Sequence, residues 1–269
     1  MEKTVLLAGG DRLQTWLARL LAEKCAVRTL AVPRCPDTVR PGPCDLLVLP
    51  CPCLDRNGMV RTAGEGLPLE GLLPFLGPET RIFGGALGRA AAELGPYCAS
   101  VTDLLEDPAV TEENAALTAE AALMLTQQSL EAPVRGLSAA VLGWGRIGRR
   151  LGALLTAHGA AVTAAARREE ARAEAEAASC AACAFSELPE DFDLVFNTVP
   201  ARTLSDAQLR RLGSNCLWVE LASAPGGLPD PPPEGLRVLP AGSLPGRILP
   251  RAAAEVLFAG ILRTVRWME

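Results

Sequence analysis

The chain has no excess of basic residues and no long apolar segment. Its 26 Lys and Arg residues are outnumbered by 31 Asp and Glu residues, which gives a formal net charge of −5. A negative chain has no electrostatic reason to bind nucleic acid or an anionic membrane, so we expect neither as a partner. No run approaches the ~18 apolar residues of a membrane span, and the first residues lack the features of a signal peptide. We therefore expect a cytoplasmic protein.

The sequence also lacks a convincing metal or disulfide pattern. Its nine cysteines are odd in number and scattered, which argues against a disulfide framework in a chain of this length. Two pairs of cysteines lie close in sequence, Cys51/Cys53 and Cys180/Cys183. The sequence has no second Cys-x-x-Cys motif and no histidine near either pair, as a metal site would need. We expect mostly buried, reduced thiols and no metal site.

A glycine motif, Gly-Trp-Gly-Arg-Ile-Gly at 143–148, is the clearest chemical signal that is present. An apolar run precedes it, and a helical segment at 149–158 and a second apolar run at 160–166 follow, as in a βαβ unit. The first glycine makes the tight turn, the second lets the backbone approach a pyrophosphate, and the third packs helix on strand. The helix N-terminus attracts phosphate. We therefore predict a dinucleotide site whose loop residues are Gly143, Gly145, Arg146, Ile147 and Gly148.

The end of the second predicted strand indicates which dinucleotide binds. An NAD site usually has an acidic residue there, about 20 residues past the glycines, for the ribose 2′-hydroxyl. Here the strand ends in Ala166 and is followed by Arg167 and Arg168. Arginine offers both the charge and the planar donors that suit a 2′-phosphate. We therefore predict NADP(H).

The only histidine, His158, lies at the expected C-terminal end of the motif helix. A cation is favourable there because of the helix dipole. That helix end points away from a bound cofactor, so His158 is not expected to act as an acid or base. This excludes dehydrogenases that depend on a catalytic histidine.

The rest of the chain predicts an α/β fold of two Rossmann-like, doubly wound domains with a cleft between them, linked by a long helix. A strand at 4–8, the turn Gly9-Gly10-Asp11 and an amphipathic helix at 12–24 open the first domain. The long helix is expected at 111–131, with Thr111 as its N-cap. The expected parts are an N-terminal α/β domain (1–113), a linker helix (114–135), an NADP-binding Rossmann domain (136–250) and a C-terminal helix (251–269) that could pack back on the N-terminal domain.

Two later predicted strands, at 193–200 and 217–223, end where a cofactor would lie in such a domain. The further predicted cofactor-binding residues are therefore Asn197, Thr198, Val199, Pro200, Ala222 and Ser223.

Several motifs occur together in order: the glycine motif, Asn-Thr-Val-Pro at 197–200, Leu-Ala-Ser-Ala-Pro-Gly-Gly at 221–227 and Leu-Pro-Gly at 244–246. With them the chain resembles the A subunit of bacterial dipicolinate synthase over most of its length. The resemblance implies an NADP-dependent oxidation, in spore-forming bacteria, of a dihydrodipicolinate-type intermediate of the lysine branch to pyridine-2,6-dicarboxylate. It also implies that the partner is a flavoprotein-like B subunit, and we expect a homo-oligomer. The chain departs from the family at two positions. The family often has a basic residue where this chain has Ala224, and often a lysine where this chain has Arg251.

A ring dicarboxylate substrate calls for arginine clamps, because a guanidinium group fixes both the charge and the plane of a carboxylate. Arg247 and Arg251 are the candidates. The proton acceptor is left open between Glu120, Asp11, the hydroxyl of Ser223 and water. Two other functions also stay open: a histidine-free dehydrogenase or imine reductase of another small acid, and an NADP-sensing or scaffolding subunit without activity of its own.

Overall fold

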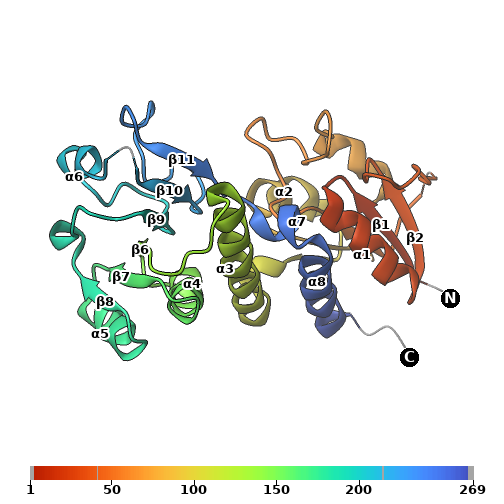
Figure 1. Cartoon of the computed structure of the whole chain (residues 1–269). Helices are drawn as coiled ribbons and strands as arrows, with labels where there is room; N and C mark the ends of the chain where they lie inside the picture. Colours follow the sequence, from red (N-terminus) through yellow and green to blue (C-terminus); the bar gives the residue numbers. More distant parts are fainter. Residues whose placement is uncertain (1–2, 41, 214, 266–269) are drawn as a thin grey trace. The chain divides into compact units, whose positions relative to one another are not determined.

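The computed structural model describes residues 3–40, 42–213 and 215–265 and contains two compact α/β units (Figure 1). The first unit comprises residues 1–114 and 245–269, and the second comprises residues 115–244. Each unit is built on a parallel sheet, so the α/β class with two Rossmann-like folds is confirmed. No helix within the described ranges is both long and apolar enough to cross a membrane.

The first unit has a five-stranded sheet in the order β2-β1-β3-β4-β5. β1 lies inside the sheet, with Val5 aligned to Val27 of β2 and to Leu46 of β3. Strands buried on both faces are expected in parallel sheets, and four of the five β1 residues are buried. The strands are β1 (Thr4–Ala8), β2 (Ala26–Leu30), β3 (Leu46–Val48), β4 (Arg81–Gly84) and β5 (Ser100–Asp103).

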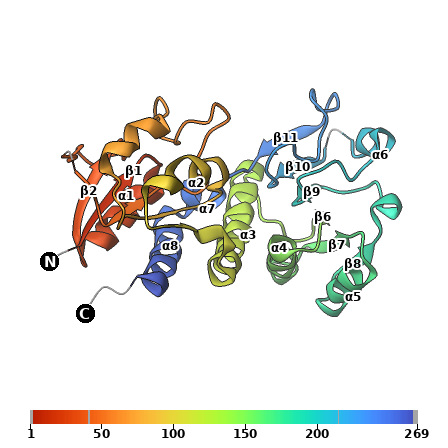
Figure 2. The same cartoon turned by 180° about the vertical axis from the view of Figure 1, so that it is seen from behind.

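Helices of the first unit come from both ends of the chain. The Asp11 carboxylate caps α1 by accepting a hydrogen bond from the Leu13 N–H at 2.8 Å. α8 packs against α1, and the two helices lie side by side in Figures 1 and 2. The helices are α1 (Arg12–Ala22), α2 (Gly88–Leu94), α7 (Leu244–Ile248) and α8 (Pro250–Thr264), with short 3-10 turns η1 (Leu69–Phe75), η2 (Gly95–Tyr97) and η3 (Leu104–Glu106).

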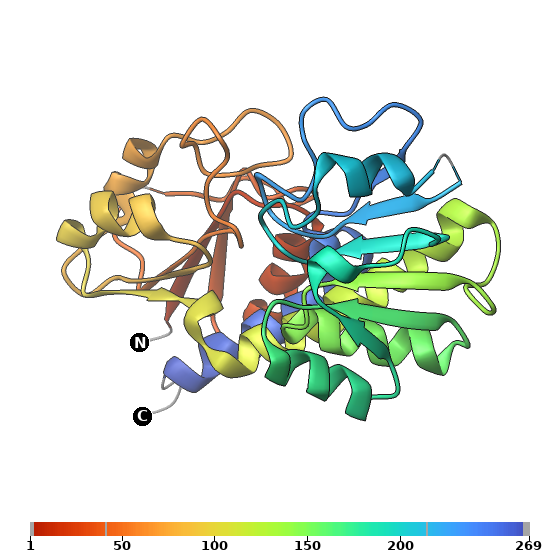
Figure 3. The ribbon, with the colours of Figure 1, turned by 90° about the vertical axis from the view of Figure 1, so that its left-hand side faces the viewer.

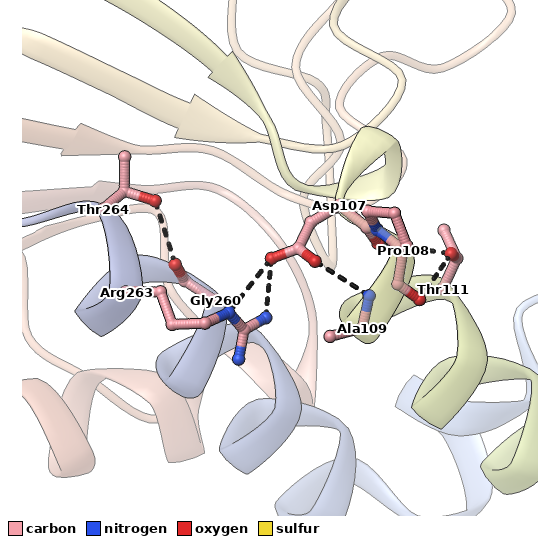
Figure 4. Close-up of polar contacts among 7 residues, drawn as sticks. All are labelled: Asp107, Pro108, Ala109, Thr111, Gly260, Arg263 and Thr264. Atoms are coloured by element: carbon pink, nitrogen blue, oxygen red, sulfur yellow. Dashed lines mark hydrogen bonds and ion pairs between the residues drawn. The ribbon is translucent and has the colours of Figure 1, made fainter.

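The long helix α3 (Pro108–Leu130) begins three residues before the predicted start at Thr111. Asp107 caps it, because its carboxylate accepts the Ala109 N–H at 2.8 Å, whereas the Thr111 hydroxyl lies within the first turn and donates to the Asp107 and Pro108 carbonyls. Asp107 also forms an ion pair with Arg263 of α8 at 2.6 Å (Figure 4). The hydrogen bond from Arg263 holds the pKa of Asp107 below its ordinary value.

The second unit has a six-stranded parallel sheet in the order β11-β10-β9-β6-β7-β8, drawn from blue to green in Figure 3. Numbered within the unit, this is the 3-2-1-4-5-6 order of dinucleotide-binding folds, and the order reverses between β6 and β9. The strands are β6 (Ser138–Leu142), β7 (Ala161–Ala165), β8 (Ala181–Cys183), β9 (Leu194–Asn197), β10 (Leu217–Glu220) and β11 (Arg237–Pro240). The helices are α4 (Arg146–Ala157), α5 (Glu169–Ala177) and α6 (Asp206–Arg211), with the 3-10 turn η4 (Phe185–Glu187).

Some predicted boundaries are wrong. The strands predicted at 193–200 and 217–223 end at Asn197 and Glu220, because the polar residues that follow form hydrogen-bonded loops. The motif helix begins at Arg146, three residues earlier than predicted. α8 ends at Thr264, and the end of the helix predicted at 251–269 lies outside the described residues.

Candidate dinucleotide-binding site

The turn between β6 and α4 requires glycine at two places. Gly143 has a φ of +94°, and a Cβ there would lie 2.7 Å from both the Thr198 Oγ1 and the Val199 Cγ2. At Gly148 a Cβ would lie 2.0 Å from the Gly143 carbonyl oxygen, so only glycine lets α4 pack this closely on the turn. Both positions have the geometry that the motif predicts.

Gly145 differs, because nothing lies within 4 Å of the position where its Cβ would be. It is the N-cap residue of α4, and no side chain caps this helix end. The first N–H groups of a helix need acceptors and carry partial positive charge. The turn therefore offers open space at the place where a phosphate would accept these hydrogen bonds.

A cavity of about 500 Å³ opens beside this turn. Three strand ends form it: the turn after β6, the turn after β7 and the loop after β9. This is the switch point of the sheet, where open α/β folds bind their ligands. The lining residues are Gly143, Trp144, Gly145, Ala166, Arg167, Arg168, Ala171, Phe185, Val199, Ala201, Arg202 and Thr203.

The lining of the cavity includes three arginines and no acidic residue. Ala166, where NAD sites usually have a carboxylate, is 3% exposed. Arg172 of α5 holds the turn after β7 by donating from Nη1 to the carbonyls of Ala166 at 3.1 Å and Arg167 at 3.0 Å. Arg167 and Arg168 themselves stay exposed at the cavity.

Arg202 is a lining residue that sequence reasoning missed. It follows the strand end at Asn197 by five residues and pairs with Asp206 of α6. The strand order places the end of β9 directly beside β6. The signal available in the sequence was therefore a basic residue just after the Asn-Thr-Val-Pro segment.

Buried polar residues hold the strand-end loops in place. Asn197 is fully buried, and its Nδ2 donates to the Val199 carbonyl at 2.9 Å and to the Glu220 Oε1 at 2.7 Å. Glu220 also accepts the Trp218 Nε1–H at 3.0 Å and the Gly227 N–H at 3.0 Å. Glu220, which sequence reasoning also missed, thus joins the loops after β9 and β10.

The predicted cofactor residues do not all line the cavity. Gly143, Gly145, Arg167, Arg168 and Val199 do. The others do not line it, and they range from exposed to buried. These residues are Arg146, Ile147, Gly148, Asn197, Thr198, Pro200, Ala222 and Ser223.

The predicted catalytic residues lie in different units. Glu120, on α3, and Ser223, after β10, belong to the second unit and are exposed. Asp11 belongs to the first unit, and its carboxylate lies beside Gly246 of α7, where a Cβ would approach the Asp11 Oδ2 to 3.0 Å.

The predicted substrate arginines also belong to the first unit. Arg247 is exposed on α7. Arg251 pairs with Glu255 at 2.9 Å, and its guanidinium lies over the Trp16 ring at 5.6 Å from the ring centre.

His158 and the cysteines lie where the sequence predicts them. His158 is the exposed C-cap residue of α4, with its Nδ1 2.9 Å from the Leu154 carbonyl oxygen. All nine thiols are free. Burial raises the pKa of Cys44 to about 11 and those of Cys53 and Cys216 to about 12, so these thiols are protonated at neutral pH and poor nucleophiles.

Comparison with known proteins agrees with this geometry. Residues 108–212 match the family described as the NAD-binding domain of D-isomer specific 2-hydroxyacid dehydrogenases. The crystal structure of the dipicolinate synthase A subunit from Bacillus halodurans matches with a TM-score of 0.83 and 24% identity, over 99% of this chain and 98% of that one. The A chain of dipicolinate synthase from Bacillus subtilis matches with a TM-score of 0.79 and 25% identity, over 98% and 96%.

The chain shares the fold of these two dipicolinate synthase structures from end to end. A transhydrogenase from Sinorhizobium meliloti shares the fold at 14% identity, with a TM-score of 0.62 over 97% of this chain and 92% of that one. No curated protein matches the sequence. The matched domain and the dipicolinate synthase structures support an oxidoreductase that uses a nicotinamide dinucleotide.

Proposed function

We propose that the chain is an NADP-dependent dehydrogenase that oxidises a dihydrodipicolinate-type intermediate to pyridine-2,6-dicarboxylate. The choice of NADP rests on the cavity beside the glycine turn. This cavity has Ala166 where NAD sites usually have an acidic residue, and it is lined by Arg167, Arg168 and Arg202. Guanidinium groups bind phosphate through paired hydrogen bonds. The choice of substrate is supported by the full-length likeness to the A subunits of dipicolinate synthase.

The cofactor fits this site because the turn leaves open space at Gly145 and requires glycine at Gly143 and Gly148. The N-terminus of α4 would hold the pyrophosphate, and the arginines would hold the 2′-phosphate. A dinucleotide held there would supply the hydride acceptor for oxidation of the substrate ring. The balanced products would be the aromatic dicarboxylate, NADPH and one proton.

The protein's contribution is to orient the substrate and exclude water. Arg247 and Arg251 are proposed to bind the substrate carboxylates. Glu120, Asp11, the Ser223 hydroxyl or water takes the proton. Normal rates in Glu120→Gln and Asp11→Asn proteins would eliminate both carboxylates from this role.

The resemblance to the dipicolinate synthase structures extends the proposal to the setting of the reaction. We place it in the cytoplasm of a spore-forming bacterium, in a homo-oligomer that works with a flavoprotein-like B subunit.

The test is to mix the purified chain with NADP⁺ and the dihydrodipicolinate-type intermediate, with and without a B subunit. We expect equal amounts of NADPH and pyridine-2,6-dicarboxylate. NADP binding without turnover, even when the B subunit is present, would favour a sensing or scaffolding role. Turnover of another small acid but not of the lysine-branch intermediate would favour a different dehydrogenase.

A further inference from the structure

One face of α1 gathers positive charge around a single tryptophan. Arg12, Trp16 and Arg19 are spaced three or four residues apart, so they share that face, and Thr15 is likewise three residues from Arg12 and four from Arg19. Together with Arg34, from the loop after β2, they line a cavity of about 90 Å³.

The arginines of this cavity have no acidic partner within the described ranges. Arg12, Arg19 and Arg34 form no ion pair with any residue that the structure describes, and no acidic side chain lines the cavity. The chain as a whole carries a net charge of −5, so this concentration of cations is a local feature. Neighbouring like charges repel, and a bound anion would relieve that repulsion.

The surrounding contacts orient the cavity walls. The Arg19 guanidinium lies over the Trp16 ring at 4.7 Å from its centre, within the range of a cation–π contact. The Arg251 guanidinium lies over the same ring at 5.6 Å. The buried Thr15 hydroxyl donates to the Pro33 carbonyl at 2.7 Å, which fixes the loop that carries Arg34 against α1.

We propose that this cavity binds one oxyanion group, a phosphate or a carboxylate, carried by a small molecule. The cavity of about 90 Å³ has room for one such group beside the arginines. Planar guanidinium groups match both anions through paired hydrogen bonds. The proposal does not depend on the dinucleotide site, although Arg251, one of the proposed substrate-binding arginines, lies over the same Trp16 ring.

The test titrates the full chain with inorganic phosphate, and separately with succinate, at constant ionic strength while tryptophan fluorescence is recorded. We expect a saturable change with at least one probe that is absent in Trp16→Phe, since Trp16 lines the cavity. The tighter probe identifies whether the natural ligand is a phosphate ester or a carboxylic acid.

Variants distinguish this site from general charge effects. Arg12→Gln and Arg34→Gln leave the stacked pair of Arg19 and Trp16 in place, and each should weaken binding about tenfold, in the range for a hydrogen bond to a charged group. The matched control is Arg56→Gln, which removes an exposed arginine of the same unit that does not line the cavity.

A second control, Arg167→Gln/Arg168→Gln, should keep the Trp16 signal, which separates this cavity from the dinucleotide site. The proposal is overturned if neither probe saturates, if the change persists in Trp16→Phe, or if Arg56→Gln weakens binding as much as the cavity variants do.

Discussion

Two glycines of one motif have different tasks, and substitution separates them. Gly143 combines a φ of +94° with close neighbours, whereas Gly145 is open on its Cβ side. We expect Gly143→Ala to reduce the free energy of unfolding by about 1–3 kcal/mol through backbone strain. Gly145→Ala should leave stability nearly unchanged but weaken NADP binding roughly tenfold, because the new methyl group occupies the space that the phosphate needs.

Urea denaturation and calorimetric NADP titration measure the two effects. Equal losses of stability in the two variants, or full NADP affinity in Gly145→Ala, would contradict these separate roles.

Glu220 is predicted to stabilise the strand-end loops rather than to react. Its carboxylate oxygens accept hydrogen bonds from Asn197, Trp218, Ala222 and Gly227. In Glu220→Gln the new amide N–H₂ faces donors, so we expect a loss of about 1–3 kcal/mol in the free energy of unfolding. Urea denaturation measures the loss, with the exposed Glu234→Gln as control. Unchanged stability would show that the loops are held by other contacts.

At the scale of elements, sequence patterns located most strands and the longer helices but not their ends. Strand β1 was predicted at its observed bounds, because an apolar run stops there at two glycines. Strand β8 was missed, since its three residues, Ala181–Cys183, carry no alternating pattern and are not fully buried. The start of α3 was misplaced because Asp107 and Thr111 are both acceptable N-cap residues in sequence, whereas in the structure Asp107 accepts the Ala109 N–H and pairs with Arg263.

That ion pair joins the first turn of α3 to α8 and predicts a pH-dependent stability. The lowered pKa of Asp107 means that its contribution is present above the ordinary carboxyl pKa of about 3.9. It is lost as the pH falls through the lower pKa of the folded state. Asp107→Asn keeps an N-cap residue but removes the charge. We expect it to lower the melting temperature at pH 7 and to have little effect at acid pH.

Thermal melts of wild type and Asp107→Asn across this pH range test the prediction. Glu93→Gln, which removes an exposed ion pair within α2, is the control and should change the melting temperature less. A difference for Asp107→Asn that stays constant down to acid pH would contradict the assigned role of the ion pair.

For the whole molecule, the sequence could predict the class of the fold because two strand–glycine–helix patterns recur in it, at 4–24 and at 139–158. It could also predict the glycine turn and the basic pair, which are adjacent in sequence to the strands that position them. It could not predict Arg202 at the cavity, or Arg34 and Arg251 beside the Trp16 face of α1, because the sheet order, the loop after β2 and the packing of α8 on α1 bring these groups together from distant segments.

The central claim, an NADP site built from the strand ends of the second unit, is tested most directly by the ratio of the Kd for NAD⁺ to the Kd for NADP⁺. We expect wild type to prefer NADP⁺, and Arg167→Gln/Arg168→Gln to lose most of that preference by weakening NADP⁺ binding at least tenfold while leaving NAD⁺ binding nearly unchanged. Arg202→Gln should reduce the preference to a smaller extent, since its charge is shared with Asp206. Equal affinity of the wild-type chain for the two cofactors, or an unchanged ratio in the double variant, would contradict the account.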